Sequence, residues 1–371
     1  MKYIFLQNII APYRVSLFNR LQKVGFDFEV LYMSLSEGDR NWKIDLGTLR
    51  YKYILDKGFY RYVRGFHLHF NWKLLKYIYK HPSTIVLGAS WNDLNVMALC
   101  LMKRLGLLKQ HKLIFWSEAN YMTIGARKSN KLRDKLRNYI FNSGIWGFIV
   151  PGEMALLTLQ RWNVKVKNYC FLPNVIEEDG LQEFNGLRKY AEIPEFVMPV
   201  RLDEKIKGII NFFRAVGIDN IKRCKFHVLG DGCDRKLVED YVNKNNLQDY
   251  IILHGFCNTS SMVSHYMQAD AFVLPSFSDP SPLSIVEACY YKLPLLISER
   301  CGNHYETLVE GKNGYKFDPD NHIEVRNKFE QFLNCRSEWP IMGEVSRKMY
   351  EDNFAQQKVI EKFINSVQAF K

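Results

Sequence analysis

The sequence predicts an α/β protein with two doubly wound parallel sheets. Short apolar segments alternate with segments in which apolar residues recur at helical spacing, which is typical of parallel strands covered by helices on both faces. The alternation runs from residue 2 to residue 162, stops in a polar stretch after Pro173, and starts again at residue 195. Because 371 residues are enough for two domains of ordinary size, we expect two Rossmann-like domains.

The first set of elements begins with a strand at residues 2–9 and a helix that starts at Pro12 and ends near Gly25. Further strands are predicted at residues 26–33, 84–88, 112–116 and 145–150, and further helices near residues 93–106, 130–142 and 151–162. These elements define a first domain over residues 1–172.

The second set of elements defines a second domain over residues 195–353, joined to the first by a linker at residues 173–194. Its strands are predicted at residues 195–200, 225–230, 251–254, 270–275 and 294–298, and its helices near residues 207–216, 234–245, 259–268, 282–291 and 303–310. We expect a last helix, near residues 354–371, to pack back on the first domain.

Composition restricts the location of the protein. Gln7 and Asn8 interrupt the first apolar run, which is too short for a signal peptide, and no stretch approaches the roughly 18 apolar residues of a membrane-spanning helix. We therefore expect a cytoplasmic protein. The eight cysteines are scattered without a C-x-x-C pair, which predicts buried, reduced thiols and neither a zinc site nor a disulfide framework.

Charge is distributed unevenly between the halves. Residues 1–170 contain 27 Lys and Arg against 10 Asp and Glu, whereas residues 171–371 contain 24 against 29. Such asymmetry suggests that the first half meets an anionic surface, which could be nucleic acid, anionic lipid or a phosphate-bearing substrate.

The basic residues concentrate in residues 51–80, where they alternate with aromatic residues, and in residues 127–137. A helix in the second segment would carry Leu132, Leu136, Tyr139 and Ile140 on one face, surrounded by Arg127, Lys128, Lys131, Arg133, Lys135 and Arg137. Two interpretations stay open: an ordinary core-facing helix with a solvated basic face, or a surface that contacts anionic lipid.

In open α/β sheets ligands bind beyond the carboxyl ends of the strands, so the turns after predicted strands are the candidate binding residues. Arg201 follows one such strand, and Lys207 stands at the head of the next helix. Two cations beside a helix N-terminus, with its dipole and free N–H groups, predict a diphosphate site. A solvated charged turn is the alternative.

Two further turns follow neighbouring strands. Gly230 and Gly232 would let a ligand approach the backbone closely. At Gly255 and Phe256 a nucleotide base could lie against backbone and an aromatic ring, while His254 by itself is typical of a structural histidine. Each of these signals is weak alone.

The fourth turn is the strongest signal. Asp279 and Glu287 flank a Ser/Pro-rich turn, residues 281–284, that opens a helix. The helix start would offer N–H groups to a phosphate, Glu287 could accept hydrogen bonds from ribose hydroxyls, and Asp279 could hold sugar hydroxyls. The alternative is a capping Asp and a solvated Glu.

The order of these turns resembles the carboxyl-terminal half of glycosyltransferase family 4, whose members are retaining enzymes of the GT-B fold, with two Rossmann-like domains facing across a cleft. The resemblance is good over residues 195–318 and looser over residues 1–175. The motifs that carry it are Arg201…Lys207-Gly208, Gly230-Asp231-Gly232, His254-Gly255-Phe256, Leu274-Pro275-Ser276, Asp279-x7-Glu287-Ala288, Leu293-Pro294, Asn313-Gly314 and, in the first half, Ala11-Pro12-Tyr13-Arg14 and Pro173-Asn174.

The resemblance implies that Arg201 and Lys207 bind the donor diphosphate, that Glu287 binds the ribose, and that Asp279 faces the transferred sugar. Two departures from the family pattern matter. Asp279 replaces the usual Glu, and the Arg-to-Lys spacing is one residue longer, so Lys205 competes with Lys207 for the phosphate. The implied donor-binding set also includes Gly230, Gly232, Gly255, Phe256, Ser281, Pro282, Leu283 and Ser284.

In the first half the family often has a His near the cleft, at a strand end. Glu118 or Ser117 stands in its place here, so Glu118 is a candidate catalytic residue. Asn8 and Arg14 flank the first turn and are candidate acceptor-side residues. For Arg14, a local cap or ion pair is the alternative.

The leading hypothesis is a retaining glycosyltransferase that moves a sugar from a nucleoside diphosphate sugar to a glycan or lipid-pyrophosphate-linked acceptor, in cell-surface polysaccharide synthesis. The resemblance implies front-face attack, in which the leaving diphosphate oxygen takes the acceptor proton. Fixed positive groups would replace a metal, so no metal is required, and the only D-x-D triplet, Asp318-Pro319-Asp320, is interpreted as structural.

Three other hypotheses stay open. A GT-B sugar-nucleotide epimerase would use the same donor site. The basic first half also suggests a nucleic-acid-binding protein, but no recognised binding module accompanies the charge, so we expect no nucleic-acid partner. A non-catalytic sugar-nucleotide or membrane-partner protein is suggested by the Asp279 departure. Contact with the inner face of the cytoplasmic membrane would use the basic residues of 51–80 and 127–137.

Overall fold

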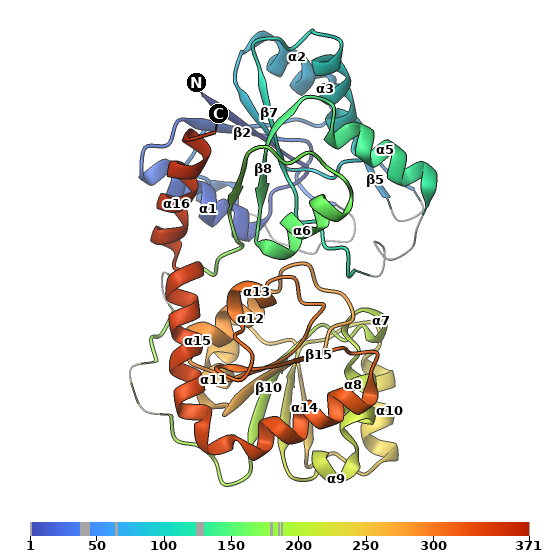
Figure 1. Cartoon of the computed structure of the whole chain (residues 1–371), viewed down its shortest axis with the longest axis vertical. Helices are drawn as coiled ribbons and strands as arrows, with labels where there is room; N and C mark the ends of the chain where they lie inside the picture. Colours follow the sequence, from blue (N-terminus) through green and yellow to red (C-terminus); the bar gives the residue numbers. More distant parts are fainter. Residues whose placement is uncertain are drawn as a thin grey trace.

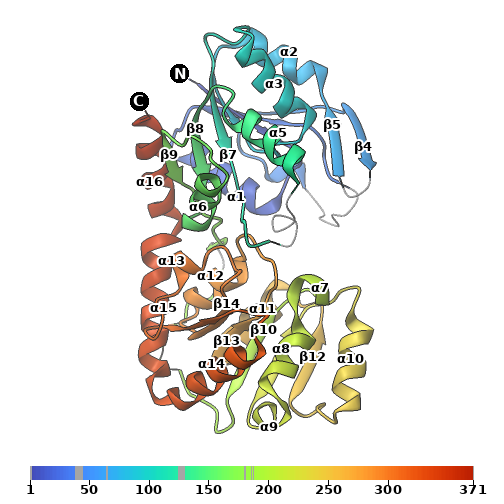
Figure 2. The same cartoon turned by 45° about the vertical axis from the view of Figure 1, so that its right-hand side comes forward.

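The computed structural model describes residues 2–37, 45–63, 66–123, 130–178, 181–184, 186 and 188–370. The chain forms two α/β domains stacked one above the other, as Figures 1 and 2 show. Each domain is built on a parallel sheet, as the alternation of apolar segments predicted. Of the basic residues named above, Arg127 and Lys128 lie outside the described residues.

The sheet of the first domain has seven strands in the order β3-β2-β1-β6-β7-β8-β9. The strands are β1 (Tyr3–Gln7), β2 (Phe28–Tyr32), β3 (Tyr53–Leu55), β6 (Thr84–Leu87), β7 (Lys112–Trp116), β8 (Ile145–Val150) and β9 (Tyr169–Phe171). The helices are α1 (Pro12–Lys23), α2 (Trp72–Lys80), α3 (Leu94–Arg104), α5 (Lys131–Phe141) and α6 (Glu153–Arg161), with a 3-10 turn at Leu46–Thr48.

Residues of one strand serve two cores in this domain, because neighbouring side chains point to opposite faces of the sheet. Ile4 and Leu6 of β1 are buried in a core with residues of α2 and α3. Tyr3 and Phe5 are buried in a core on the other face, with residues of α1. The sequence did not predict the antiparallel hairpin of β4 (Phe59–Val63) and β5 (Phe66–Phe70).

The sheet of the second domain has six strands in the order β12-β11-β10-β13-β14-β15, all parallel. The strands are β10 (Glu195–Pro199), β11 (Lys225–Leu229), β12 (Ile251–Gly255), β13 (Ala271–Leu274), β14 (Leu295–Ser298) and β15 (Gly314–Phe317). The helices are α7 (Glu204–Lys207), α8 (Ile209–Val216), α9 (Ile218–Ile221), α10 (Arg235–Lys244), α11 (Thr259–Gln268), α12 (Leu283–Tyr290), α13 (His304–Thr307) and α14 (His322–Asn334), followed by a 3-10 turn at Arg336–Glu338.

Two consecutive helices end the chain and connect both domains. α15 (Trp339–Asn353) packs on α12 and α13 of the second domain, and α16 (Gln356–Gln368) continues along the side of the molecule to the first domain (Figure 1). Val359, Ile360 and Phe363 of α16 are buried in the first-domain core that also contains residues of α1. The chain therefore crosses between the domains twice, once before β10 and once between α15 and α16.

No described helix is both long enough and apolar enough to cross a membrane. All eight cysteines are free, and five of them are buried. The expectation of buried thiols is wrong for Cys233, which is exposed because it lies in the turn between β11 and α10. Cys257 and Cys335 are half-buried.

Candidate active site

Lys207 and Asp279 meet at the carboxyl edge of the second sheet. Lys207 is the last residue of α7, and Asp279 lies in the loop between β13 and α12. The Lys207 Nζ donates to Asp279 Oδ2, and the two side chains are only 16% and 14% exposed. The Asp279 carbonyl also accepts from the Gly302 N–H at 2.8 Å. Two residues that the sequence singled out separately thus form one ion pair.

The other two predicted cations do not join this pair. The Arg201 side chain is 61% exposed and contacts Asp203 Oδ2 at 3.1 Å. Lys205 is exposed. Of the two lysines that compete for the phosphate role, Lys207 is the one that an acidic side chain holds at the edge of the sheet.

The prediction that free N–H groups stand beside Lys207 is wrong. α8 begins at Ile209, two residues after Lys207, but the Glu204 carboxylate reaches over its first turn. Glu204 Oε2 accepts from the Ile210 N–H at 2.9 Å, and Oε1 accepts from the Asn211 N–H at 2.8 Å. These groups are therefore satisfied within the protein and are not available to an anion.

The start of α12 differs from the start of α8. Pro282 occupies the N-cap position, where no side chain accepts a hydrogen bond, and the first turn contains no acidic residue. The N–H groups and the positive end of this helix are therefore available to an anion. The Pro282 carbonyl accepts from Asn303 Nδ2 at 2.9 Å, which fixes the loop. The neighbouring Ser281, Leu283 and Ser284 are half-buried.

Glu287 lies one turn into α12 and is bonded from within the domain. The Tyr266 O–H donates to Glu287 Oε2 at 2.6 Å, and burial raises the pKa of the Glu287 carboxyl. Tyr266 itself is buried. One carboxylate oxygen of Glu287 is therefore held in place.

Close packing explains why glycine occupies positions 230 and 232 in the turn after β11. A Cβ on Gly230 would lie 2.2 Å from the Val200 carbonyl, and a Cβ on Gly232 would lie 2.2 Å from the Leu202 carbonyl. The two glycines therefore allow this turn to pack directly against the segment that carries Arg201.

The next turn presents an aromatic side chain to solvent. Gly255 has a φ of 71°, which a side chain disfavours. The adjacent Phe256 is 84% exposed, so its ring is available for stacking.

A cavity of about 420 Å³ lies between the domains, mainly in the first. The predicted residues Asn8, Arg14 and Glu118 all line it, and Pro280 faces it from the second domain. The structure therefore brings the three candidate residues of the first half together, opposite the loop that contains Asp279.

Arg14 is bonded across the domain, and the alternative of a local cap or ion pair is wrong. It pairs with the Glu118 carboxylate, and its guanidinium carbon lies 3.5 Å from the centre of the Trp116 ring. Asn174 Nδ2 donates to the same Glu118 oxygen at 3.3 Å. Arg14 is buried, whereas the Glu118 side chain is 34% exposed, so the carboxylate is the more accessible partner.

The sequence did not indicate a second polar group at this cavity. Glu37 is buried and lines the cavity, and its Oε1 accepts from Asn8 Nδ2 at 2.9 Å. The buried His69 lies behind it, 3.6 Å from Glu37 Oε1 through Nε2 and 3.4 Å from Asp93 Oδ2 through Nδ1. A carboxylate supported by an imidazole therefore faces the cavity beside Asn8.

The D-x-D triplet has a structural role, in agreement with its interpretation from the sequence. Asp318 and Asp320 both bind the Nη2 of the buried Arg300. The Arg300 carbonyl in turn accepts from Asn120 Nδ2 of the first domain at 3.3 Å. The triplet therefore supports a contact between the domains.

Comparisons with known proteins agree with this geometry. Residues 182–352 match the family model of glycosyl transferases group 1. The alpha-monoglucosyldiacylglycerol synthase of Acholeplasma laidlawii is 22% identical over 169 residues, which is 45% of this chain and 40% of that protein. The poly(ribitol-phosphate) alpha-N-acetylglucosaminyltransferase of Staphylococcus aureus is 22% identical over 221 residues, 58% of this chain and 43% of that protein. The chain thus spans about two fifths of the length of these curated relatives.

Solved structures resemble the whole chain. The lipopolysaccharide outer core galactosyltransferase WaaB superposes with a TM-score of 0.72 at 14% identity, covering 100% of this chain and 99% of that one. Anabaena Alr3699/HepE, in complex with UDP and glucose, superposes with a TM-score of 0.70 at 11% identity over 100% of both chains.

The two domains therefore have the GT-B glycosyltransferase fold, which confirms the predicted fold class. Residues 182–352 match the glycosyl transferases group 1 model, so the comparisons support the predicted glycosyltransferase and are compatible with family 4. These two curated relatives match 45% and 58% of the chain, and the family model covers residues 182–352, whereas the likeness of the first domain to the solved structures is one of fold.

Proposed function

We propose that the chain is a retaining glycosyltransferase that moves a sugar from a nucleoside diphosphate sugar to a glycan or lipid-linked acceptor, in cell-surface polysaccharide synthesis. The observation that carries the proposal is the Lys207–Asp279 pair beside the uncapped start of α12. Asp279 lies on the loop whose Pro280 faces the cavity lined by Arg14 and Glu118. The UDP and glucose of the Anabaena structure support a donor of this class.

The charge distribution fits departure of a diphosphate. The anomeric C–O bond to the diphosphate breaks, the acceptor oxygen forms its bond on the same face of the sugar, and the acceptor proton passes to the departing phosphate oxygen. Lys207 and the N–H groups at the start of α12 would stabilise the negative charge that develops on that oxygen. Asp279 would hold sugar hydroxyls, Glu287 the ribose, and Phe256 the base. We infer that these groups suffice without a metal.

The acceptor would enter from the first domain. Asn8, Arg14 and Glu118 line the cavity, and Glu37 adds a second carboxylate. Hydroxyl-rich glycans are bound by such carboxylates and amides, which accept and donate hydrogen bonds. The catalytic role of Glu118 remains part of this proposal.

UDP is the probe for the donor site. Wild-type protein should bind UDP, and the Lys207→Gln variant should bind it about tenfold to a hundredfold more weakly, because a hydrogen bond to a charged group contributes about 1.5–3 kcal/mol. Lys205→Gln is the matched control, since it removes an exposed lysine two residues away and should bind like the wild type. Calorimetry measures all three affinities. Equal losses in both variants would contradict the assignment of Lys207.

The retaining outcome has its own test. The first-formed product from UDP-glucose, followed by NMR, should have the α configuration of the donor, and a β product would contradict the mechanism. Formation of an epimerised sugar nucleotide without acceptor would favour the epimerase instead.

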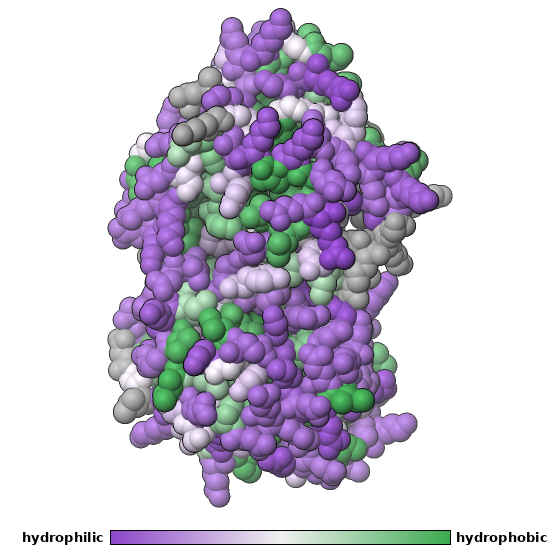
Figure 3. Space-filling view, in the orientation of Figure 1, coloured by the Kyte–Doolittle hydropathy of each residue, from purple (hydrophilic) through white to green (hydrophobic). Residues whose placement is uncertain are grey.

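Contact with an anionic membrane is a finer part of the proposal, supported by the surface of α5. Of the four apolar residues predicted on one face of this helix, only Ile140 is buried, and the helix packs on the core through Ile140 and Phe141. Leu132 is 78% exposed, with the exposed Lys131 and Lys135 on either side. Figure 3 shows apolar atoms exposed among hydrophilic ones on this domain. Arg137, by contrast, is buried, bonds Asp134 and stacks on Trp162.

Vesicle sedimentation tests this contact. The wild type should bind vesicles that contain phosphatidylglycerol better than vesicles of phosphatidylcholine alone, and the double change Lys131→Glu with Lys135→Glu should abolish the difference. The same charge change at Lys236 and Lys244, on α10, should leave it intact. Equal binding by both double variants would contradict a role for α5.

A further inference from the structure

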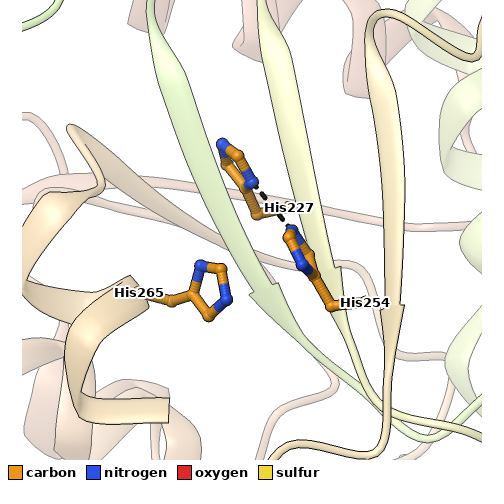
Figure 4. Close-up of side chains that lie close together, drawn as sticks. All are labelled: His227, His254 and His265. Atoms are coloured by element: carbon orange, nitrogen blue, oxygen red, sulfur yellow. Dashed lines mark hydrogen bonds between the residues drawn. The ribbon is translucent and has the colours of Figure 1, made fainter. Parts of the chain in front are cut away.

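Three histidines from separate parts of the second domain come together on one face of its sheet. His227 lies in β11, His254 in β12 and His265 in α11 (Figure 4). The register pairs His227 with Ile252 and shifts at His254, between the Val228–Leu253 and Leu229–Gly255 pairs, and the His227 and His254 rings are stacked there. The side chain of His265 comes from the helix toward them.

The ring nitrogens are close enough to share one ion. His227 Nδ1 lies 3.0 Å from His254 Nε2, and one nitrogen of each ring lies within 4.8 Å of the others. Two nitrogens on one tetrahedral Zn²⁺ would be about 3.3 Å apart, given Zn–N distances of about 2.0–2.1 Å. The strand pair already has this separation, and the His254 and His265 rings have centroids 4.3 Å apart. A rotation of the His265 ring would complete the set.

A carboxylate, that of Glu195, lies beside the His227 ring, as often occurs next to a metal-bound imidazole. His227 Nε2 lies 3.3 Å from Glu195 Oε2, so the nitrogen on the far side of the ring from His254 faces an acceptor. A metal-bound imidazole usually donates its other N–H to such a group, which fixes its tautomer and orientation. Glu195 therefore leaves Nδ1 of His227 as the nitrogen with a free electron pair.

We propose that His227, His254 and His265 bind one divalent transition-metal ion of the Zn²⁺ class, with water completing the coordination and Glu195 positioning His227. Three imidazoles favour Zn²⁺ or its neighbours over Mg²⁺ and Ca²⁺, which take oxygen ligands. Burial lowers the pKa of each imidazole, in agreement with the neutral form that metals require.

None of the three histidines lines the cavity between the domains, and His254 lies two residues before Phe256 of the proposed donor site. β12 is the edge strand of the sheet, and α11 follows it directly. An ion at this place would connect β11 and the edge strand β12 to α11 and so stabilise the margin of the second domain next to Phe256. Its role would be structural, and it is independent of the donor site at Lys207.

The proposal is tested by treating the full, untagged chain with a chelator and then titrating it with metal ions. Co²⁺ should give the visible absorption of a nitrogen-bound tetrahedral ion, with one ion per chain, and Zn²⁺ should displace it. Zn²⁺ at a hundredfold excess over its Kd should raise Tm by about 5 °C or more, whereas Mg²⁺ should not. Absence of the Co²⁺ bands at one equivalent, or an equal shift with Mg²⁺, would overturn the proposal.

Variants separate this site from adventitious binding. His265→Gln and His254→Gln should weaken Zn²⁺ binding at least about tenfold, and Glu195→Gln about tenfold to a hundredfold. His322→Gln is the matched control, because His322 is exposed in the same domain and bonds the Asn211 side chain. It should bind Zn²⁺ as the wild type does. Zn²⁺ affinity unchanged in His265→Gln and His254→Gln would show that the ion binds elsewhere.

Discussion

Glu306 makes the contact between the domains dependent on pH. Its Oε1 accepts from the Glu153 N–H at the start of α6 at 2.6 Å, across the interface. A Cβ on Gly152 would lie 2.5 Å from the same oxygen, so the carboxyl fits closely against the first domain. Glu306 Oε2 is buried and accepts no hydrogen bond from the described residues.

The size of the effect of Glu306 on the free energy of unfolding follows from the pKa of its carboxyl. Burial raises the pKa of the Glu306 carboxyl from 4.5 to about 7. Between these two values the folded chain holds a proton that the unfolded chain has lost. The stabilising contribution of the protonated carboxyl is therefore complete below about pH 4.5 and is lost as the pH rises through about 7. A difference of about 2.5 units corresponds to about 3 kcal/mol in the free energy of unfolding.

Glu306→Gln is the perturbation, because a glutamine has the same shape and no charge at any pH. The stability of the variant should depend less on pH than that of the wild type. The free energy of unfolding of the variant minus that of the wild type should therefore rise by about 3 kcal/mol between pH 5 and pH 8. Thermal unfolding across this range measures the difference. Glu310→Gln is the control, since it removes an exposed carboxylate that pairs with Lys328. A variant-minus-wild-type difference that is the same at pH 5 and pH 8 would refute the reasoning.

Three other changes test the two sides of the cleft. Gly302→Ala should weaken UDP binding about tenfold, because the new Cβ would lie 1.9 Å from the Pro280 carbonyl and must displace the donor loop, as calorimetry can show. Tyr266→Phe should lower stability by about 1–3 kcal/mol in thermal unfolding, since the half-buried Glu287 loses its donor. Glu37→Gln should raise the KM for the acceptor in steady-state kinetics while UDP affinity stays unchanged, and a loss of UDP affinity would contradict its acceptor-side place.

The sheets and the order of the turns could be predicted from the sequence because they depend on local signals. A buried parallel strand is a short apolar run, and the residues after it stand at the ligand edge by topology alone. This reasoning found Lys207 and Asp279, which the fold then joins across 72 residues. It also found Asn8, Arg14 and Glu118, which line one cavity.

The remaining site features depend on contacts that no local pattern carries. Glu204 caps α8 from the preceding short helix, reaching past Gly208 in the left-handed region. In the sequence, nothing distinguishes Glu204 from an ordinary acidic residue in the first turn of a helix. Glu37 and His69 come from a loop and from the unpredicted hairpin. The histidine cluster combines residues 227, 254 and 265, whose proximity requires strand register and helix placement together.

The Lys207–Asp279 pair leads to predictions for the affinities of UDP and of UDP-glucose. In the structure the ammonium is satisfied by the carboxylate, so a diphosphate that binds Lys207 must compete with Asp279. The exchange replaces one anionic partner by another and frees the carboxylate for sugar hydroxyls. In Asp279→Asn, UDP no longer has to displace a carboxylate from Lys207. The ion pair stabilises the free protein by about 1 kcal/mol, so its removal should tighten UDP binding several-fold.

The same variant should lose its preference for a sugar. An amide accepts hydroxyl hydrogen bonds less strongly than a carboxylate, so the ratio of UDP-glucose affinity to UDP affinity should fall in Asp279→Asn. Calorimetry with both ligands gives this ratio directly, and Asp203→Asn, which removes the carboxylate beside the exposed Arg201, is the control. Weaker UDP binding in Asp279→Asn would mean that Asp279 positions Lys207 for the diphosphate instead of competing with it. That result would also contradict the proposal that the Asp279 carboxylate is released to bind sugar hydroxyls.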